Sequence, residues 1–176
     1  MSLGSTLETA LGVNTPHKFY GKYRGTVINN EDPLQIGRIQ ALVPDVSNVM
    51  PTSWAMPCLP GLGIQYGVCV VPPLGAGVWI EFEQGDPDYP IWTGGFWGSA
   101  AEVPPLTRAR LPTNPGIVMQ TVAQNTIAIT DVPPQILIKV GSSTIMVRAD
   151  GISIIAPSIT MNGALVVNNG ALAVSM

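Results

Sequence analysis

Few side chains in this sequence have the types and spacing that chemistry requires. The densest group is four carboxylates, Glu81, Glu83, Asp86 and Asp88. Two carboxylates can serve as the acid and the base of a glycosidase, and several together can bind Ca²⁺. These four, however, alternate with apolar residues and then flank an Asp-Pro step. That pattern favours acids on a strand surface and in a turn.

The other candidate groups are one histidine and two cysteines. His17 alone cannot complete a metal site, and the usual Ser-His-Asp, Cys-His and zinc arrangements need more partners. Cys58 and Cys69 do not form a CxxC pair, and their apolar neighbours predict two small buried side chains. No phosphate-binding glycine pattern occurs. We therefore expect no catalytic residue, no cofactor and no bound metal.

The composition indicates that much of the surface faces other protein. Charged residues make up 11% of the 176 residues, against roughly 25% in an ordinary soluble domain. Hydrophobic residues make up 46% and the net charge is −3. The chain contains no basic stripe, so binding to nucleic acid through phosphate contacts is not expected. An obligate oligomer fits this composition better than a small soluble enzyme does.

Proline and glycine interrupt the sequence throughout and predict an all-β chain of short strands. Residues 1–18 are expected to form an N-terminal arm, and residues 19–98 an OB-type barrel. A small Greek-key sandwich would have the same size. Val78, Ile80 and Phe82 alternate with more polar neighbours, as in a strand with two different faces. The expected strands are residues 23–29, 37–42, 67–71, 77–82 and 91–94.

The chain changes character after a proline-rich stretch at residues 99–116, which predicts an extended linker. In residues 117–176 apolar residues recur in pairs two positions apart, with Gly, Asn or Asp corners between the pairs. The pairs are Ile127/Ile129, Ile136/Ile138, Ile145/Val147, Ile152/Ile154, Ile159/Met161, Leu165/Val167 and Leu172/Val174. Such a repeat is typical of a stacked β architecture.

One pair per layer cannot enclose a core within a single chain. A single-chain β-helix would complete fewer than about three turns in this length. We therefore predict a trimeric intertwined β-helix, with three chains around one axis. Met146, Arg148 and Ser153 are expected to point outward. The predicted trimer core consists of Ile145, Val147, Ile152, Ile154, Ile159 and Met161.

A group of motifs in residues 72–97 carries a family resemblance. They are a Pro-x-x-Gly turn, a strand ending Phe-Glu, the sequence Gly-Asp-Pro-x-x-Pro, and a final strand ending Gly-x-x-Trp. In this order they resemble the OB-fold domain of phage baseplate assembly protein V and of the spikes of type VI secretion and extracellular injection systems. Upstream, the segments 23–27, 29–33, 37–44 and 53–55 resemble the family's opening hairpin and its next block.

The resemblance implies a non-enzymatic central spike subunit of a contractile tail baseplate, which punctures the target cell envelope. It also implies a homotrimer with a baseplate hub protein at the OB end. Some relatives end in a His-x-His tip, which is missing from residues 171–176, so a separate PAAR-like tip protein is expected. The spike would be made in the bacterial cytoplasm, since no secretory signal is evident, and would reside in a virion tail baseplate or an injection machine.

Two other classes of function remain open at this point. One is an OB module that binds glycan or single-stranded nucleic acid, which would require a groove with exposed aromatic residues. The other is a β-helical spike that degrades polysaccharide, which would require an acidic pair in a cleft.

Overall fold

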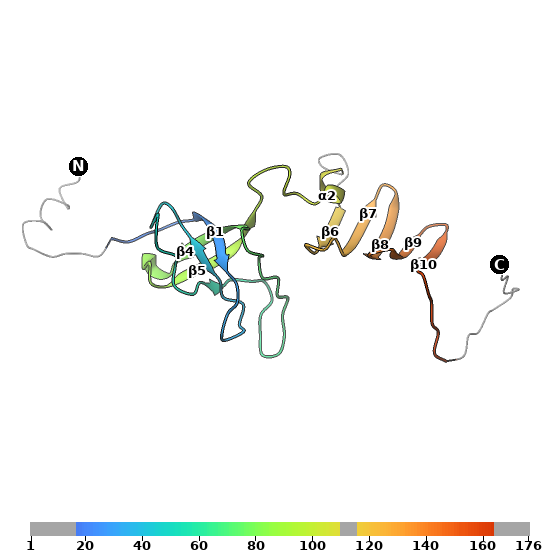
Figure 1. Ribbon diagram of the computed structural model, residues 1–176, viewed down its shortest axis with the longest axis horizontal. Helices are drawn as coiled ribbons and strands as arrows, with labels where there is room; N and C mark the ends of the chain where they lie inside the picture. Colours follow the sequence, from blue (N-terminus) through green and yellow to red (C-terminus); the bar gives the residue numbers. More distant parts are fainter. Residues whose placement is uncertain (1–16, 110–115, 164–176) are drawn as a thin grey trace, which may run out of the picture. The chain divides into compact units, whose positions relative to one another are not determined.

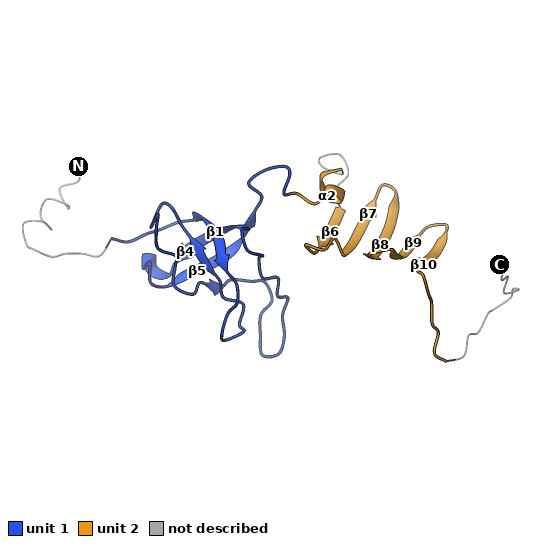
Figure 2. Cartoon of the chain, viewed as in Figure 1, with its two compact units in different colours: residues 1–102 blue, residues 103–176 orange. Residues whose placement is uncertain are grey.

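The computed structural model describes residues 17–109 and 116–163. The chain divides into two units, residues 1–102 and residues 103–176, and each contains a five-stranded sheet (Figures 1 and 2). Apart from one short helical turn in each unit, the described elements are strands, as the all-β prediction requires. Within these described ranges no helix is long and apolar enough to span a membrane.

The first unit is a closed barrel. Its sheet has the order β2-β1-β4-β5-β3, in which only β3 and β5 run parallel. Ile39 and Ala55, which directly precede β2 and β3, exchange two backbone hydrogen bonds and join the ends of the sheet. This connectivity is that of a five-stranded OB barrel. The strands are β1 (Tyr23–Asn29), β2 (Gln40–Leu42), β3 (Met56–Pro57), β4 (Gly77–Phe82) and β5 (Pro90–Phe96).

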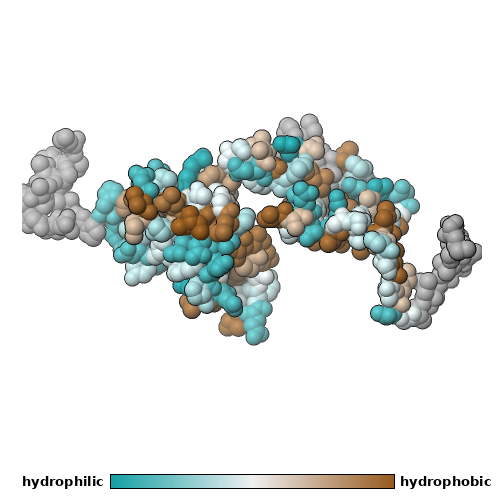
Figure 3. Space-filling view, in the orientation of Figure 1, coloured by the Kyte–Doolittle hydropathy of each residue, from teal (hydrophilic) through white to brown (hydrophobic). Residues whose placement is uncertain are grey.

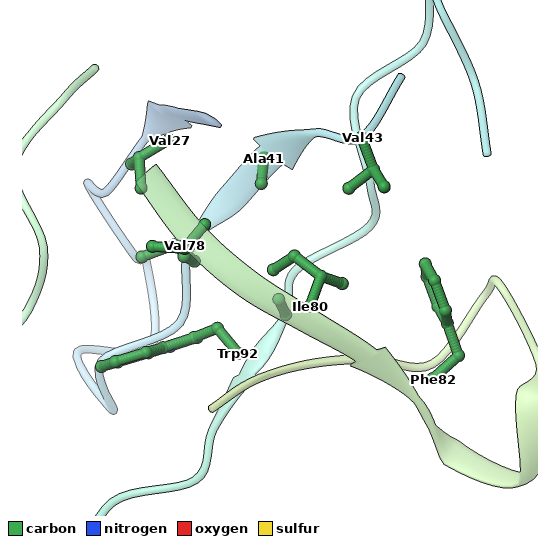
Figure 4. Close-up of a cluster of buried hydrophobic side chains, with 9 residues drawn as sticks. Val27, Ala41, Val43, Val78, Ile80, Phe82 and Trp92 are labelled. Carbon is green, nitrogen blue, oxygen red and sulfur yellow. The ribbon is translucent and has the colours of Figure 1, made fainter. Parts of the chain in front are cut away.

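The barrel core follows from the two-residue period of its strands. Val78, Ile80 and Phe82 are buried along β4, whereas the intervening residues are partly exposed, as predicted. Trp92 of β5 is also buried, and its indole N–H donates to the Gly37 carbonyl at 3.0 Å. That bond satisfies the one polar group of this large side chain. The remaining core residues, several of them shown in Figure 4, are Val27, Ile39, Ala41, Val43 and Ala55.

One carboxylate organises the loop from β1 to β2. Asp32 accepts backbone hydrogen bonds from Leu34, Ile36 and Arg38, and it accepts two more from the Arg38 side chain. The Arg38 guanidinium, helped by the backbone N–H groups, holds the pKa of Asp32 well below its usual range. The guanidinium also lies over the Trp54 ring, 5.4 Å from its centroid. Asp32 thus anchors the turn that begins at Asp32-Pro33.

Some expectations for this unit are wrong. Residues 67–71 form no strand, and the two-residue strand β3 was not predicted. Cys58 and Cys69 are free and exposed on the chain, not buried. In all three cases the local apolar pattern is misleading, because strand pairing and burial depend on which distant segment is available as a neighbour.

The second unit is a sheet of consecutive antiparallel strands in the order β10-β9-β8-β7-β6. Two-residue turns join β7 to β8, β8 to β9 and β9 to β10, and each turn leaves the flanking residues paired. Gly141 takes a positive φ of 57° in the second of these turns, where glycine avoids steric cost. The strands are β6 (Gly116–Gln120), β7 (Thr126–Asp131), β8 (Pro134–Val140), β9 (Ser143–Arg148) and β10 (Gly151–Ile155).

The proline-rich linker is not wholly extended. A single helical turn, α2 (Pro105–Arg108), begins with proline in its first turn and contacts β6. Proline is tolerated there because the first helical N–H groups have no partner within the helix. Residues 1–16, 110–115 and 164–176, which include the last two apolar pairs and the expected tip, lie outside the described part.

We predict that Asp32→Asn lowers the midpoint of thermal unfolding of the barrel by several degrees at pH 7. The folded-state pKa of Asp32 is depressed, so its stabilising effect is complete above the unfolded pKa of about 4. That effect is lost as the pH falls through the folded-state pKa. The difference in unfolding midpoint between the wild type and the variant should therefore become smaller as the pH is lowered below about 4.

Tryptophan fluorescence measures this transition in the barrel, because all four tryptophans lie in the first unit. The exposed Asp45 offers a matched control, Asp45→Asn, with little expected change. An Asp32→Asn deficit that stays the same from pH 7 to pH 3 would contradict the assignment.

Candidate functional site

The second sheet carries two apolar rows that cross all five strands. Strand pairing places Ile127 beside Ile138, and Ile138 beside Ile145. Because neighbouring strands stay in register, side chains of one parity fall on one face of the sheet. The first row is Met119, Ile127, Ile138, Ile145 and Ile154; the second is Ile117, Ile129, Ile136, Val147 and Ile152.

This apolar face is uncovered in the single chain. All ten side chains of the two rows are exposed, from 38% for Val147 to 70% for Ile152. Figure 3 shows hydrophobic surface on the second unit as well as on the first. A contiguous apolar face of this extent is rare on a monomeric protein and marks an interaction surface. The chemistry available here is association with protein rather than catalysis.

The opposite face of the sheet is different in character. Thr126, Ala128 and Thr130 of β7 are buried there, and the two threonine hydroxyls donate to backbone carbonyls. Arg148 lies opposite Gln135 and its side chain donates to that amide oxygen at 3.4 Å. The sheet therefore has one apolar face that is exposed in every strand, and one mixed face that is buried at β7 and exposed at β10.

The structure places four of the six predicted core residues in these rows. Ile145 and Ile154 are direct partners in one row, and Val147 and Ile152 in the other. Met146 and Ser153 pair on the opposite face, on the side predicted for them. Ile159 and Met161 follow β10 in a segment without strand pairing as far as residue 163, and both are exposed.

The sequence analysis missed the first pair of the face. The expected repeat begins at Ile127, whereas Ile117 and Met119 of β6 already continue the two rows. Their two-residue spacing was a usable signal. It was obscured because residues 121–125 form a longer turn, in which Thr121 and Asn125 are joined by backbone and side-chain hydrogen bonds, so the pair falls outside the later spacing.

Two of the four carboxylates, Glu81 and Asp86, are held by structural partners, and the other two, Glu83 and Asp88, line one groove of the barrel. Glu81 is paired with Lys22 on the strand surface, and Asp86 bonds the backbone N–H of Asp88 and the Lys18 ammonium. The Asp88 N–H, followed by Lys18, lowers the pKa of Asp86. A glycosidase acid needs a raised pKa, so that it holds its proton near neutral pH. Asp86 is thus a turn residue.

Two half-buried aromatic side chains of the barrel, Trp79 and Phe96, are engaged with a cation and with each other. The Arg24 guanidinium lies 5.2 Å from the Trp79 ring and 4.8 Å from the Phe96 ring, which contact one another. A platform for bases or sugars needs free ring faces, and the guanidinium already lies against these two rings. Among the residues that the structure describes, the exposed aromatic side chains are Tyr20, Tyr66, Tyr89 and Trp97.

A closed OB barrel followed by a sheet with an uncovered apolar face defines an all-β protein that is suited to association with other protein chains. Comparison with protein families agrees. Residues 23–97 match the type VI secretion system/phage-baseplate injector OB domain, and residues 116–173 match the phage baseplate V C-terminal trimerisation domain. No curated protein matches the chain.

The chain belongs to the phage baseplate V family. The matched trimerisation domain coincides with the sheet that carries the apolar face, and it supports a homotrimer. The family also supports a role as a baseplate spike and a location in the tail baseplate. The expected OB barrel is confirmed. The described sheet is compatible with the intertwined β-helix, which stays a prediction.

We predict that Ile152→Asp prevents trimer formation or lowers the unfolding midpoint of the trimer strongly. The substitution places three carboxylates in one apolar layer, and burying each unpaired charge costs at least about 3 kcal/mol. Ser153→Asp is the matched control, since it adds the same charge to the same strand on the opposite face. Light scattering and thermal unfolding of both variants test the assignment, and equal effects would show that the facing is wrong.

Proposed function

We propose that this chain is the central spike of a contractile injection machine and that the trimer punctures the target cell envelope. The observation that carries the proposal is the uncovered double row on the second sheet, in a segment that matches a trimerisation domain. Three copies of this face, turned towards one axis, would cover one another. The needle interior would then contain Ile145, Val147, Ile152 and Ile154, with Ile159 and Met161 in layers further along the chain.

The energetics favour such an arrangement. Each side chain of the rows is already about half covered by its own sheet, so burying the rest contributes about 1 kcal/mol. Ten such side chains in each of three copies give on the order of 30 kcal/mol before the entropy of association is subtracted. The interior would contain no charged group, because neither row includes one.

Rigidity along the sheet would come from its backbone ladders. Each of the strands β6 to β10 is hydrogen bonded to its sequence neighbours through five or six residue pairs. A push on the end of such a stack loads many hydrogen bonds in parallel and presses on a close-packed interior of low compressibility. These are mechanical properties, and no catalytic step is required for them. Contraction of the machine would supply the force.

Two partners complete the proposed machine. A baseplate hub protein would bind at the OB end, and a small PAAR-like tip protein would cover the far end of the needle. The physical need for the tip is that the sheet edge at β10 and the exposed Ile159 and Met161 beyond it require a cover.

The proposed function can be tested with contractile particles produced from the gene cluster that encodes this chain. Deletion of its gene should abolish assembled contractile particles or remove their spike, and the wild-type gene should restore them. Ser153→Asp should also restore particles, whereas Ile152→Asp should not. Envelope damage is read from dye entry into target cells. Particles that assemble and permeabilise cells without this chain would refute the proposal.

We expect the tip to be captured from the products of neighbouring genes by the intact trimer. A chain that ends at residue 163 should not capture it. Mass spectrometry of the material bound to each form identifies the partner. If the intact trimer binds none of the neighbouring products and stays monodisperse, the needle closes itself and a separate tip protein is not needed.

A further inference from the structure

The first unit has a second uncovered apolar feature, the loop at residues 60–71. Leu62, Tyr66, Val68 and Val70 are each more than half exposed, and Ile64 at the tip is 99% exposed. The loop is nonetheless well built. Gly63 and Tyr66 exchange two backbone hydrogen bonds around the tip, so Ile64 is held outward by a closed turn.

The far arm of this loop, residues 67–71, forms no strand although it is rich in valine, a composition that favours strands. Among the residues that the structure describes, no hydrogen-bond partner is found for the backbone groups of Val68, Cys69 and Val70. Exposed valines beside unpaired backbone groups are a site of association unless something covers them.

A groove lies at the base of the same loop. It has a volume of about 440 Å³, and its lining is mostly apolar, including Met56, Cys58, Leu59, Leu62 and Ile91. Glu83 and Asp88 stand among the lining residues. The tip beside Ile64 carries Gln65, whose amide N–H groups can donate to a carboxylate. The tip and the groove are thus complementary in both apolar surface and polar groups.

We propose that the tip of the 60–71 loop of one copy docks in the groove of the next copy, so that three barrels close into a ring. This contact rests on the homotrimer of the proposed function, because the residues 103–115 tether each barrel to the trimerised sheet and hold the three at high local concentration. A tip and a groove on one subunit make a heterologous contact, which a threefold rotation closes.

The distribution of charged residues in the sequence favours another copy of this chain as the partner whose loop binds in the groove. From residue 46 to residue 80 the sequence contains no Lys, Arg, Asp, Glu or His. The tip loop therefore brings no charge of its own towards the identical surfaces that symmetry places around it. The only charges at the contact are the carboxylates of the groove, and Gln65 matches them without repulsion.

Disulfide trapping in the full chain tests the contact. Cys58 lies in the groove, so Ile64→Cys places a thiol on the tip that should reach Cys58 of the next copy. Cys69→Ser removes the other native thiol. After oxidation with diamide, a non-reducing gel should show covalent trimer, because each chain carries one tip bond and one groove bond. Ile64 makes no packing contact that the fold needs, so the variant should fold normally.

Two matched controls accompany this variant. Adding Cys58→Ser should abolish the covalent trimer. Replacing Ile64→Cys by Thr26→Cys, at an exposed position of β1, should leave no trimer either. Dimers that persist when Cys58→Ser is present would show that the tips meet each other, and a bond within one chain would show that the tip reaches its own groove; both results overturn the proposal.

Light scattering separates failure of this contact from failure of the proposed function. If light scattering shows a trimer but no disulfide forms between position 64 and Cys58, only the proposed loop contact is refuted. If light scattering shows a monomer, both the trimeric spike and the proposed loop contact are refuted. If the thiol introduced at position 64 reacts freely with maleimide until the neighbouring hub protein is added, the loop binds that protein, and the proposal is overturned.

Discussion

The second unit depends on one constraint: ten apolar side chains stand on a single face of a sheet that cannot cover them. The antiparallel register keeps every strand in phase, so the sheet has no means of turning individual residues away from water. A face of this kind requires identical or complementary surface from other chains. Residues 116–173 match a trimerisation domain, and in the proposed spike two further copies of the same face would supply this surface. The low charge of the whole chain is consistent with such an arrangement.

The barrel meets a different constraint. Its core is small, and two of its strands have only two or three residues. Two features compensate for the short strands. The Ile39–Ala55 bridge closes the barrel, and Arg38 anchors the loop that contains Asp32. Both devices lie where the chain leaves or enters strands. In the proposed spike, these two devices would help the barrel to pass force to its neighbours.

Two of the acids that first suggested chemistry, and one large aromatic side chain, have structural roles. Asp86 holds a turn, Glu81 is paired with Lys22, and Trp92 lies in the core with its N–H bonded. Each of these groups stabilises backbone geometry or packing. The exposed rows of the second sheet are apolar and uncharged, and they are therefore suited to protein partners.

The sequence by itself determined those features that depend on local periodicity and turn chemistry. The two-residue alternation identified β4 and the shared face of Ile145, Val147, Ile152 and Ile154, since side chains alternate along any strand. The motifs at residues 72–97 identified the OB domain. Only the tertiary structure decided which segments pair: it added Ile117 and Met119 to the rows, left residues 67–71 without a partner and exposed both cysteines. Pairing and burial depend on residues distant in the chain, which no local pattern specifies.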